Sequence, residues 1–440
     1  MKMDLLTEIP DNLTRGWRAL QRRLAGRGGD TPAAEPDELS FWSALLGRES
    51  AQWEAARKAA ENGPRVLMAT GLGGHLFASS TESTLAAALT LRGARVEMLL
   101  CDALLPACQL SKLAAVSPEQ LVGERPQPRC GSCRSASSKI FEPFGLPIHW
   151  YGQMVTPEQA EEARRTAADI PAERIGTYKW DGLAVGEHAL AGALRYYARG
   201  DLHGEPAGES VLRRYLESSL LSVYAVRGLL ERHRFDVACF HHGIYVPQGL
   251  VGEVCRRHGV RVVNWNPAYR KHCFIFSHGN TYHHTMITEP TGDWEHIPWT
   301  PELESEAMAY LKSRWYGTQD WIWFHEKPQE DVEHIARETG IDFSKPCIGM
   351  LTNVMWDAQL HYRSNAFPDM LAWVLQTIEY FAKRPELQLV IRVHPAEIRG
   401  SIPSRQPLVA EIERAFPTLP RNVFVVPPES QVSTYALMER

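Results

Sequence analysis

The stretch RVLMATGLGGHLFASSTESTLAAALTLRGARVEMLL, residues 65–100, decides the fold. Its first six residues form a short apolar strand, and the glycines that follow supply a turn. The Ala- and Leu-rich run 79–92 has helical periodicity, and RVEMLL (95–100) supplies the next strand. A strand, turn, helix, strand order is a βαβ unit, so we expect a parallel Rossmann-like sheet.

The same alternation of strand and helix recurs along the chain. A strand at 235–240, a helix at 249–258 and a strand at 261–264 continue the first domain. Between them, 101–230 contains long helical stretches near 157–168 and 209–232 and a Pro- and Cys-bearing loop at 125–134, and the pattern does not order its strands. A second set comprises strands at 347–351, 387–393 and 422–426, helices at 368–383 and 407–416, and a helix beginning at 434.

These patterns predict an α/β protein with two Rossmann-like domains. A helical N-terminal appendage covers 1–62, the first domain 63–340 and the second domain 341–440, after a Trp- and Pro-rich region and a helix at 330–340. A complete doubly wound domain normally has more strands than the second set supplies. We therefore expect the second domain to be incomplete and the natural chain to continue beyond Arg440.

The amino-acid composition argues against a membrane-spanning, a nucleic-acid-binding and a secreted protein. The chain has 440 residues, 44% of them hydrophobic and 22% charged, with a formal net charge of −5. No run of about 18 apolar residues could span a bilayer, and the charge calls for no nucleic-acid partner. The first nine residues lack the basic and apolar regions of a secretory signal, so we expect a cytoplasmic protein.

The segment IRVHPAE (391–397) is the first candidate for chemistry, because ligands of open α/β sheets bind beyond the carboxyl ends of strands. Arg392 and His394 lie two residues apart and so point to the same side of a strand. With a helix N-terminus nearby, this cationic pair could stabilise a nucleotide phosphate, and Glu397 belongs to the same donor site. The alternative is a polar strand end that caps the next helix.

The loop LTNVMWDAQLH (351–361) follows the first strand of the second domain and should face the same cleft. Thr352 and Asn353 can form hydrogen bonds to a donor, and Asp357 can act as a base or as a hydroxyl acceptor. Trp356 can stack on a sugar or a base. A structural loop packed by Trp356 is the alternative.

The turn TGLGGH (70–75) follows the first strand of the first domain. Gly73 and Gly74 permit close approach of the backbone to an acceptor, and His75 near the helix start could remove the acceptor's proton. The turn matches neither a full dinucleotide-binding motif nor a phosphate-binding loop with its lysine and serine. His75 could equally cap the helix.

Histidines and aromatic residues are dense between 241 and 284. We expect His242 to be a further base candidate, and we expect an acceptor pocket built from hydrogen-bonding imidazoles and aromatic faces. Metal binding is the alternative, but adjacent histidines on a strand point apart and no metal-ligand spacing occurs, so no catalytic metal is expected. The acceptor residues expected here are Tyr245, Gln248, Arg270, Lys271 and His283.

The eight cysteines are scattered, apart from the CxxC pair Cys130 and Cys133. This is no disulfide framework, and we interpret most of them as reduced thiols. Cys101 and Cys108 precede the pair at loose spacing. A structural zinc at Cys130 and Cys133 is the alternative to plain thiols, and no other cofactor is expected.

With these residues identified, the chain from about Thr70 onward resembles bacterial capsular polysaccharide biosynthesis proteins, which are glycosyltransferases. The most specific segments are GIYVPQG (243–249), SHGNTYHH (277–284), TNVMWD (352–357) and IRVHPAE (391–397). The resemblance implies the GT-B fold, in which two Rossmann domains face a cleft. Acceptor binds mainly to the first domain and donor to the second, and His394 and Pro395 match the family's phosphate-contacting element.

The expected function is metal-independent transfer of a sugar from a nucleotide sugar to a growing surface polysaccharide or glycolipid. Peripheral contact with the inner face of the cytoplasmic membrane or with an export complex would follow. Two alternatives remain: transfer of an alditol phosphate, as in teichoic-acid polymerases, and a non-catalytic subunit of a polysaccharide assembly complex.

Overall fold

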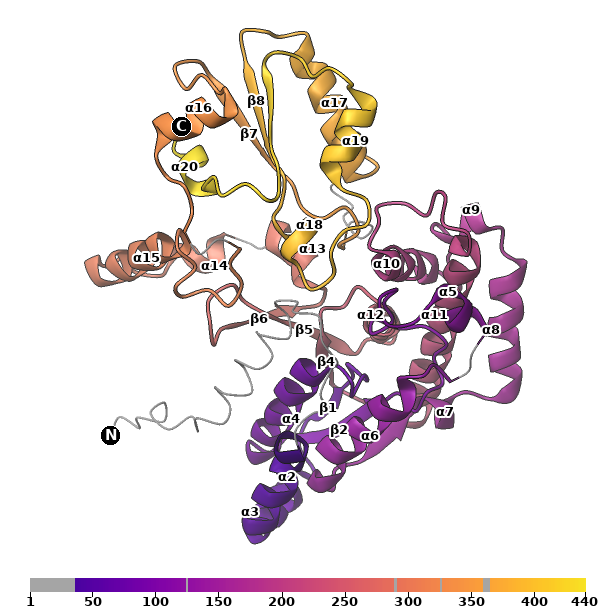
Figure 1. Ribbon diagram of the computed structural model, residues 1–440. Helices are drawn as coiled ribbons and strands as arrows, with labels where there is room; N and C mark the ends of the chain where they lie inside the picture. Colours follow the sequence, from indigo (N-terminus) through magenta and orange to yellow (C-terminus); the bar gives the residue numbers. More distant parts are fainter. Residues whose placement is uncertain (1–35, 124–125, 289–290, 325–326, 359–364) are drawn as a thin grey trace.

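The computed structural model describes residues 36–440 except 124–125, 289–290, 325–326 and 359–364. It contains two β-sheets, one of six strands and one of three, each covered by helices (Figure 1). Most of the appendage predicted at 1–62 lies outside the described residues. Its described part forms helices α2 (Pro36–Arg48) and α3 (Ser50–Ala60), whose Leu46 and Trp53 pack against Phe144 of the first domain.

The first sheet has the strand order β3-β2-β1-β4-β5-β6. All its neighbours are parallel except the β5–β6 pair. The predicted α/β class with a mostly parallel sheet is therefore confirmed. The strands are β1 (Arg65–Met68), β2 (Arg95–Leu100), β3 (Ile148–Trp150), β4 (Val237–His241), β5 (Arg261–Pro267) and β6 (Phe274–His278).

Alternating side chains divide the core of the first domain into two layers. Leu67 and Leu99 face one layer, whereas Met68 and Met98 face the other, because successive strand residues point to opposite faces. The helices of the first layer are α5 (Pro118–Gly123), α7 (Tyr151–Met154), α8 (Pro157–Asp169), α9 (Ala172–Ile175), α10 (Val185–Tyr197), α11 (Gly208–Arg232) and α12 (Gln248–Arg257). The second layer contains α4 (Leu76–Leu91) and α6 (Cys130–Phe141), and the short helix η1 (Glu142–Phe144) follows α6.

Three elements differ from the sequence-based expectation. The end of the loop predicted at 125–134 is the first turn of α6, which begins at Cys130. Strands β3 and β6 were not predicted: β3 has only three residues, and β6 is an edge strand whose Phe274, Ile275 and Phe276 remain exposed. Both lack the buried apolar pattern that identifies an inner strand.

The second sheet has the order β7-β8-β9 and is parallel throughout. Its elements are β7 (Cys347–Leu351), β8 (Gln388–Arg392), β9 (Val423–Val426), α16 (Val332–Thr339), α17 (Met370–Ala382), α18 (Ala396–Arg399), α19 (Leu408–Ala415) and α20 (Thr434–Met438). Helices α17 and α19 cover one face, and α16 and α20 cover the other. Ile335 of α16 packs with Val390 and Val426, so the structure places this helix in the second domain rather than before a boundary near 340.

Helices α13 (Tyr282–Thr288), α14 (Gly292–Glu295) and α15 (Pro301–Arg314) lie between the two sheets in the chain. Direct contacts also join the domains. Arg405 forms an ion pair of 2.8 Å with Glu205, and Gln406 donates a hydrogen bond of 2.8 Å to Asp201. None of the helices in the described part of the chain combines the length and the apolar character that crossing a bilayer requires.

Candidate functional site

The first candidate site lies at the carboxyl ends of β1 and β4, and we call its group His75, His241, His242 and Tyr245 the crevice. The chain order reverses between these two neighbouring strands, and such a switch point is where open α/β sheets bind ligands. His75 starts α4 after β1, and His241 ends β4. Their ring centroids lie 5.1 Å apart, so the structure joins two histidine-bearing segments that are far apart in the sequence.

His75 is the N-cap of α4, where its Nδ1 accepts the backbone N–H of Ala78 at 3.3 Å. Burial, and then the charge of Arg195, lower the pKa of His75 to about 4. A neutral ring that accepts at Nδ1 carries its proton on Nε2. His75 is therefore a hydrogen-bond donor to the crevice, which argues against the predicted role as base.

His242 extends the crevice toward α13. Its ring centroid lies 5.1 Å from that of His283 and 5.2 Å from that of Tyr245. The backbone at His242 has a φ of 65°, in the left-handed region, which turns the chain away from the strand. Burial, and then His283, hold the pKa of His242 well below 6.5.

Two imidazole nitrogens of this cluster are unsatisfied as hydrogen-bonding atoms within the described residues. Among the residues that the structure describes, the buried Nδ1 atoms of His241 and His242 have no hydrogen-bond partner. Buried polar atoms are usually satisfied, so an exception calls for an explanation such as a ligand. The crevice can therefore offer hydrogen bonds to a polar molecule.

A buried carboxyl group lies beneath the crevice. Glu82 of α4 accepts hydrogen bonds from the Thr70 hydroxyl and, at 3.1 Å, from the indole N–H of Trp265. Thr70 in turn accepts the backbone N–H of His241 at 2.8 Å. Burial raises the pKa of Glu82 to about 7. This network fixes the end of β4 against α4.

Gln248 was predicted to bind acceptor, but the structure gives it another role. Its side chain is fully buried, and Nε2 donates to Oε1 of Gln109 at 2.7 Å. Arg195, which donates to the Gln109 carbonyl at 2.5 Å, lies over the Tyr245 ring at 5.2 Å. Gln248 thus supports the crevice wall, whereas Arg195, inside the mostly apolar α10, gave no signal in the sequence.

Tyr245 connects the crevice to the second domain. Its hydroxyl donates to Asp357 at 2.6 Å and accepts the backbone N–H of Ala358 at 3.3 Å. Asp357 is half-buried and belongs to the loop after β7. The structure thus brings three predicted residues together, since His242 packs on Tyr245.

Internal contacts engage four of the residues that were predicted to bind acceptor, namely Gly73, Gly74, Arg270 and Lys271. A side chain at Gly73 would meet Ser137 Oγ at 2.1 Å, so this glycine is needed for packing against α6, and the Gly74 N–H donates to Cys133. Arg270 pairs with Glu306 at 3.4 Å, and Lys271 donates to the Thr318 carbonyl at 3.0 Å. Both basic residues are engaged by the 306–323 segment.

The second candidate site lies at the carboxyl end of β8. His394 Nδ1 accepts the backbone N–H of Ala396 at 3.0 Å, so Nε2 carries the proton of the neutral ring. Burial, and then Arg392, lower the pKa of His394 to about 4. Thr352 is buried and accepts the His394 backbone N–H at 3.1 Å. Thr352 therefore positions the histidine instead of facing a ligand.

Arg392 forms contacts inside the protein, which do not favour the predicted phosphate contact. Its guanidinium is buried and donates to the backbone carbonyls of Pro427 at 2.6 Å and Ser430 at 3.2 Å. Burial, and then the charge of Arg399, lower its pKa to about 10. Arg392 joins β8 to the loop before α20, and His394 is neutral, so the predicted cationic pair is not present.

Glu397 and Asn353 also form internal contacts. Glu397 is buried and accepts the backbone N–H of Leu408 at 3.0 Å at the start of α19. Burial, and then the charge of Glu429, raise its pKa to about 7. Asn353 is exposed and accepts the N–H of Val354 at 2.9 Å, and Trp356 donates to Ser404 at 3.2 Å. These contacts support the alternative, structural interpretation of both segments.

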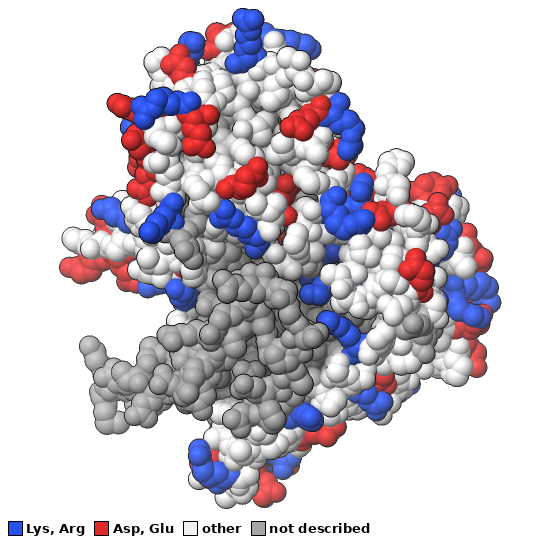
Figure 2. All heavy atoms as spheres, in the orientation of Figure 1, with Lys and Arg blue, Asp and Glu red and all other residues white. Residues whose placement is uncertain are grey.

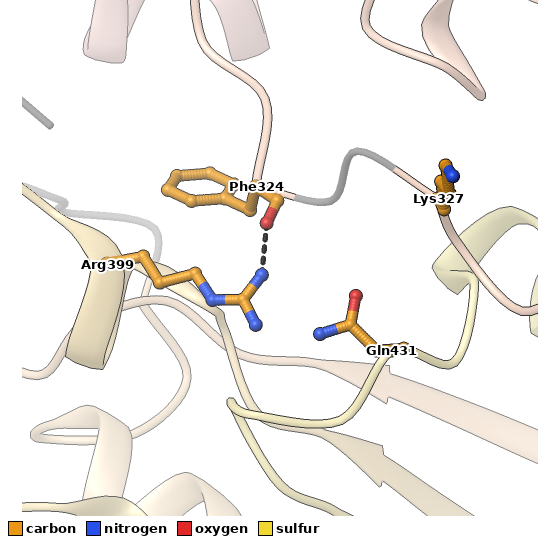
Figure 3. A pocket seen from close by; sticks show the side chains of 4 residues that line it. All are labelled: Phe324, Lys327, Arg399 and Gln431. Atoms are coloured by element: carbon orange, nitrogen blue, oxygen red, sulfur yellow. Dashed lines mark hydrogen bonds between the residues drawn. The ribbon is translucent and has the colours of Figure 1, made fainter. Parts of the chain in front are cut away.

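A cavity of about 530 Å³ opens beside His394. Its walls are Phe324, Lys327, Arg399 and Gln431, and the Phe324 ring packs edge-on against His394 with centroids 5.2 Å apart. Figure 3 shows the Arg399 guanidinium between the Phe324 carbonyl, to which it donates, and the Gln431 amide. Basic and acidic side chains are interspersed over the visible face of both domains (Figure 2), whereas the charged residues of this cavity are both basic.

Sequence reasoning missed these cavity residues. Arg399 ends the short helix that the His-Pro element begins, so its position in the sequence offered a signal. Lys327 and Gln431 come from two loops far apart in the chain, and no local pattern relates them to each other.

A group of three potential metal ligands lies away from both sites. Among the described residues, only Glu97, His149 and His233 bring three ligand atoms within 4.8 Å of one another. The Glu97 carboxylate is already bonded to Arg65 at 2.7 Å and Arg95 at 3.1 Å. Although burial opposes ionisation, the hydrogen bonds from His149 and Arg65 lower the pKa of Glu97 to about 2. Two guanidinium groups would repel a cation, so this group is an ion-pair network.

No family model matches the chain, and no curated protein matches it. Two crystal forms of Leishmania major tyrosyl-tRNA synthetase in complex with tyrosinol are among the structural matches. The triclinic form has 10% identity and a TM-score of 0.24, covering 89% of this chain and 67% of that chain. The cubic form has 11% identity and a TM-score of 0.22, covering 90% and 83%. At these scores the likeness assigns neither a fold family nor an activity.

Proposed function

We propose that the chain transfers a sugar from a nucleotide-sugar donor to a hydroxyl of a surface polysaccharide or glycolipid, in a GT-B arrangement of two domains. The observation that carries this proposal is the basic cavity beside His394. It lies where Arg399 follows β8 and Gln431 follows β9, the end of a parallel sheet at which ligands bind. A nucleotide phosphate is the anion that suits this position.

On the donor side, Lys327 and Arg399 supply the positive charge. His394 adds a neutral Nε2–H donor whose orientation is held by the Ala396 N–H on the opposite nitrogen. As the bond between sugar and phosphate breaks, negative charge grows on the departing nucleotide. Donors that are fixed beforehand stabilise that charge most in the transition state.

On the acceptor side, Asp357 is the proposed base. Its carboxylate lies at the contact between domains, where the Tyr245 hydroxyl holds it at 2.6 Å. His242 is the weaker candidate, because burial keeps its pKa well below 6.5 and an imidazole of such low pKa holds a proton poorly near neutral pH. His75 and His242 then serve as hydrogen-bonding partners for the acceptor.

Calorimetry with CMP, CDP, UDP and GDP tests the donor site. We expect one of them to bind, and we expect Lys327→Gln to weaken binding by about tenfold or more, since a charged hydrogen bond contributes about 1.5–3 kcal/mol. Lys345→Gln is the matched control, because Lys345 is exposed and pairs with Asp342 outside the cavity. Binding that Lys327→Gln leaves unchanged would exclude this cavity as the donor site.

Two outcomes separate the alternative functions. Turnover of CDP-glycerol, with sugar nucleotides left intact, would indicate alditol-phosphate transfer. Absence of binding to all four nucleotides would favour a non-catalytic subunit and refute the proposal.

A further inference from the structure

A second cavity lies at the other end of the first sheet, where β2 and β3 begin. Its walls come from helix α3, the end of α4, the start of β2 and the turn before β3. Its volume of about 830 Å³ falls in the range of about 300–1,000 Å³ that is typical of small-molecule sites. Helix α3 lies at the end of the first domain away from the second domain (Figure 1), so this cavity is separate from both candidate sites.

Two hydrogen bonds hold the walls of this cavity together. The indole N–H of Trp53 in α3 donates to the Phe144 carbonyl at 2.8 Å. One turn later, Nη1 of Arg57 donates to the Gly145 carbonyl at 2.7 Å. Trp53 also packs in the small core around Phe144. The cavity is therefore formed between elements that are fixed to each other, as small-molecule sites usually are.

Two polar groups of the lining have no hydrogen-bond partner in the part of the chain that the structure describes. The Thr90 side chain is 1% exposed, and its hydroxyl is unpaired. The Nε–H of Arg57 is also buried and unpaired, although Nη1 of the same guanidinium is bonded. Buried polar groups are rarely left unsatisfied, and the cost is greatest for a charged group. Both groups can donate, so an oxygen anion would satisfy them.

The charges around the cavity also favour an anion. Three basic residues line it, and of these Arg95 pairs with a buried carboxylate of β2 at 3.1 Å. Lys58 is exposed and forms no ion pair within the described residues. Glu54 and Glu61 line the cavity too, but both are exposed to solvent, which screens their charge. Glu54 lies 3.9 Å from Arg57 Nη2 and does not reach its Nε.

The buried part of the lining is apolar apart from Thr90. Ala60 and Val96 are 2% and 1% exposed, and Ala94 is buried beside them in the lining. Leu146, in the turn before β3, is half-buried. Small apolar side chains leave space that a hydrocarbon group can fill, and burial of its surface favours binding.

We propose that this cavity binds an amphiphilic anion, a molecule that combines one phosphate or carboxylate group with a hydrocarbon body. The anionic group would accept hydrogen bonds from Arg57 and Thr90 and be attracted by Lys58. The hydrocarbon body would contact the apolar lining. Because the walls belong to α3 and to the sheet, a bound molecule would stabilise the attachment of α3. This site does not depend on the proposed sugar transfer.

Calorimetry with the full chain tests the chemistry of the ligand. The probes are decanoate and decyl phosphate, each below the concentration at which it forms micelles. 1-Decanol, which lacks the charge, and inorganic phosphate, which lacks the hydrocarbon body, are the controls. We expect at least one of the two anions to bind, and both controls to bind at least about tenfold more weakly. The preferred anion identifies the acidic group.

Two variants test the position of the site. Lys58→Gln removes a charge, and Thr90→Val keeps the shape of the side chain while it removes the unpaired hydroxyl. Each should raise the Kd of the bound anion by about tenfold. Lys383→Gln is the matched control, because Lys383 is exposed at the end of α17 in the second domain, and it should leave the Kd unchanged.

Three results would overturn the proposal. The first is wild-type protein that binds neither anion, and the second is 1-decanol that binds as tightly as the anions. The third is a Kd that both variants share with Lys383→Gln. Circular dichroism of each variant shows whether a loss of binding reflects unfolding. The measurements on the wild-type chain decide the question even where a variant does not fold.

Discussion

Replacement of Glu82 by Gln should change how the stability of the protein depends on pH. In the folded chain burial raises the pKa of this carboxyl group from 4.5 to about 7. The folded state therefore binds the proton more tightly than the unfolded state. The stability that this group contributes is complete below about pH 4.5, is lost as the pH rises to about 7, and changes little above that. Glutamine cannot ionise, yet its carbonyl can still accept from Thr70 and Trp265.

The magnitude follows from the two pKa values. Their difference, 4.5 against about 7, corresponds to about 3 kcal/mol, because each pKa unit is worth about 1.4 kcal/mol. The free energy of unfolding of Glu82→Gln minus that of the wild type should therefore increase by about 3 kcal/mol between about pH 4.5 and pH 8. Taking this difference cancels the titration of all other groups.

Urea unfolding at a series of pH values, followed by tryptophan fluorescence, measures both free energies. Glu61→Gln is the control, since Glu61 is exposed at the end of α3 and outside the buried network, and its difference from the wild type is the baseline for comparison. A Glu82→Gln difference that does not rise above this baseline with pH would mean that Glu82 is charged in the folded protein. The account of the buried network beneath His241 would then be refuted.

Four further predictions concern the two sites and their support. His394→Ala should raise the Kd for the bound nucleotide by about tenfold, measured by calorimetry, and an unchanged Kd would remove His394 from the donor site. Tyr245→Phe should lower kcat more than KM, because it releases Asp357, and equal effects on both would contradict a positioning role. Gly243→Ala should destabilise the first domain by about 1–3 kcal/mol, since φ is 81° and a Cβ would lie 2.6 Å from Asn264 Nδ2, and an unchanged unfolding midpoint would contradict this. Asn422→Ala should lower the free energy of unfolding of the second domain by about 2–3 kcal/mol, because Nδ2 contacts three backbone carbonyls at 2.8–3.0 Å. Urea unfolding measures this free energy, and an unchanged value would mean that water replaces these hydrogen bonds.

The sites depend on which groups are charged. His75 and His394 both accept a backbone N–H through Nδ1, and burial lowers the pKa of each to about 4. Both are therefore neutral donors rather than cations. The positive charge of the second site comes from Lys327 and Arg399, which stand outside the motif that indicated the site.

Local sequence patterns determined many of the strands and helices of this protein, although not β3 and β6. The apolar runs at 65–70, 95–100 and 387–393 form β1, β2 and β8, because alternation of apolar residues and helical periodicity are properties of neighbouring residues. The same reasoning placed polar residues at the carboxyl ends of strands, and the structure brings His242, Tyr245 and Asp357 together there.

Only the tertiary structure decided what those residues do. Arg392 donates to carbonyls that lie 35 and 38 residues further along the chain, and Gly73 packs against Ser137 of α6, 64 residues away. Histidines that the sequence allowed to be bases or cations are made neutral by burial. Desolvation and long-range contacts set these outcomes. Both depend on which distant segments of the chain cover a residue, and the spacing of its sequence neighbours does not specify those segments.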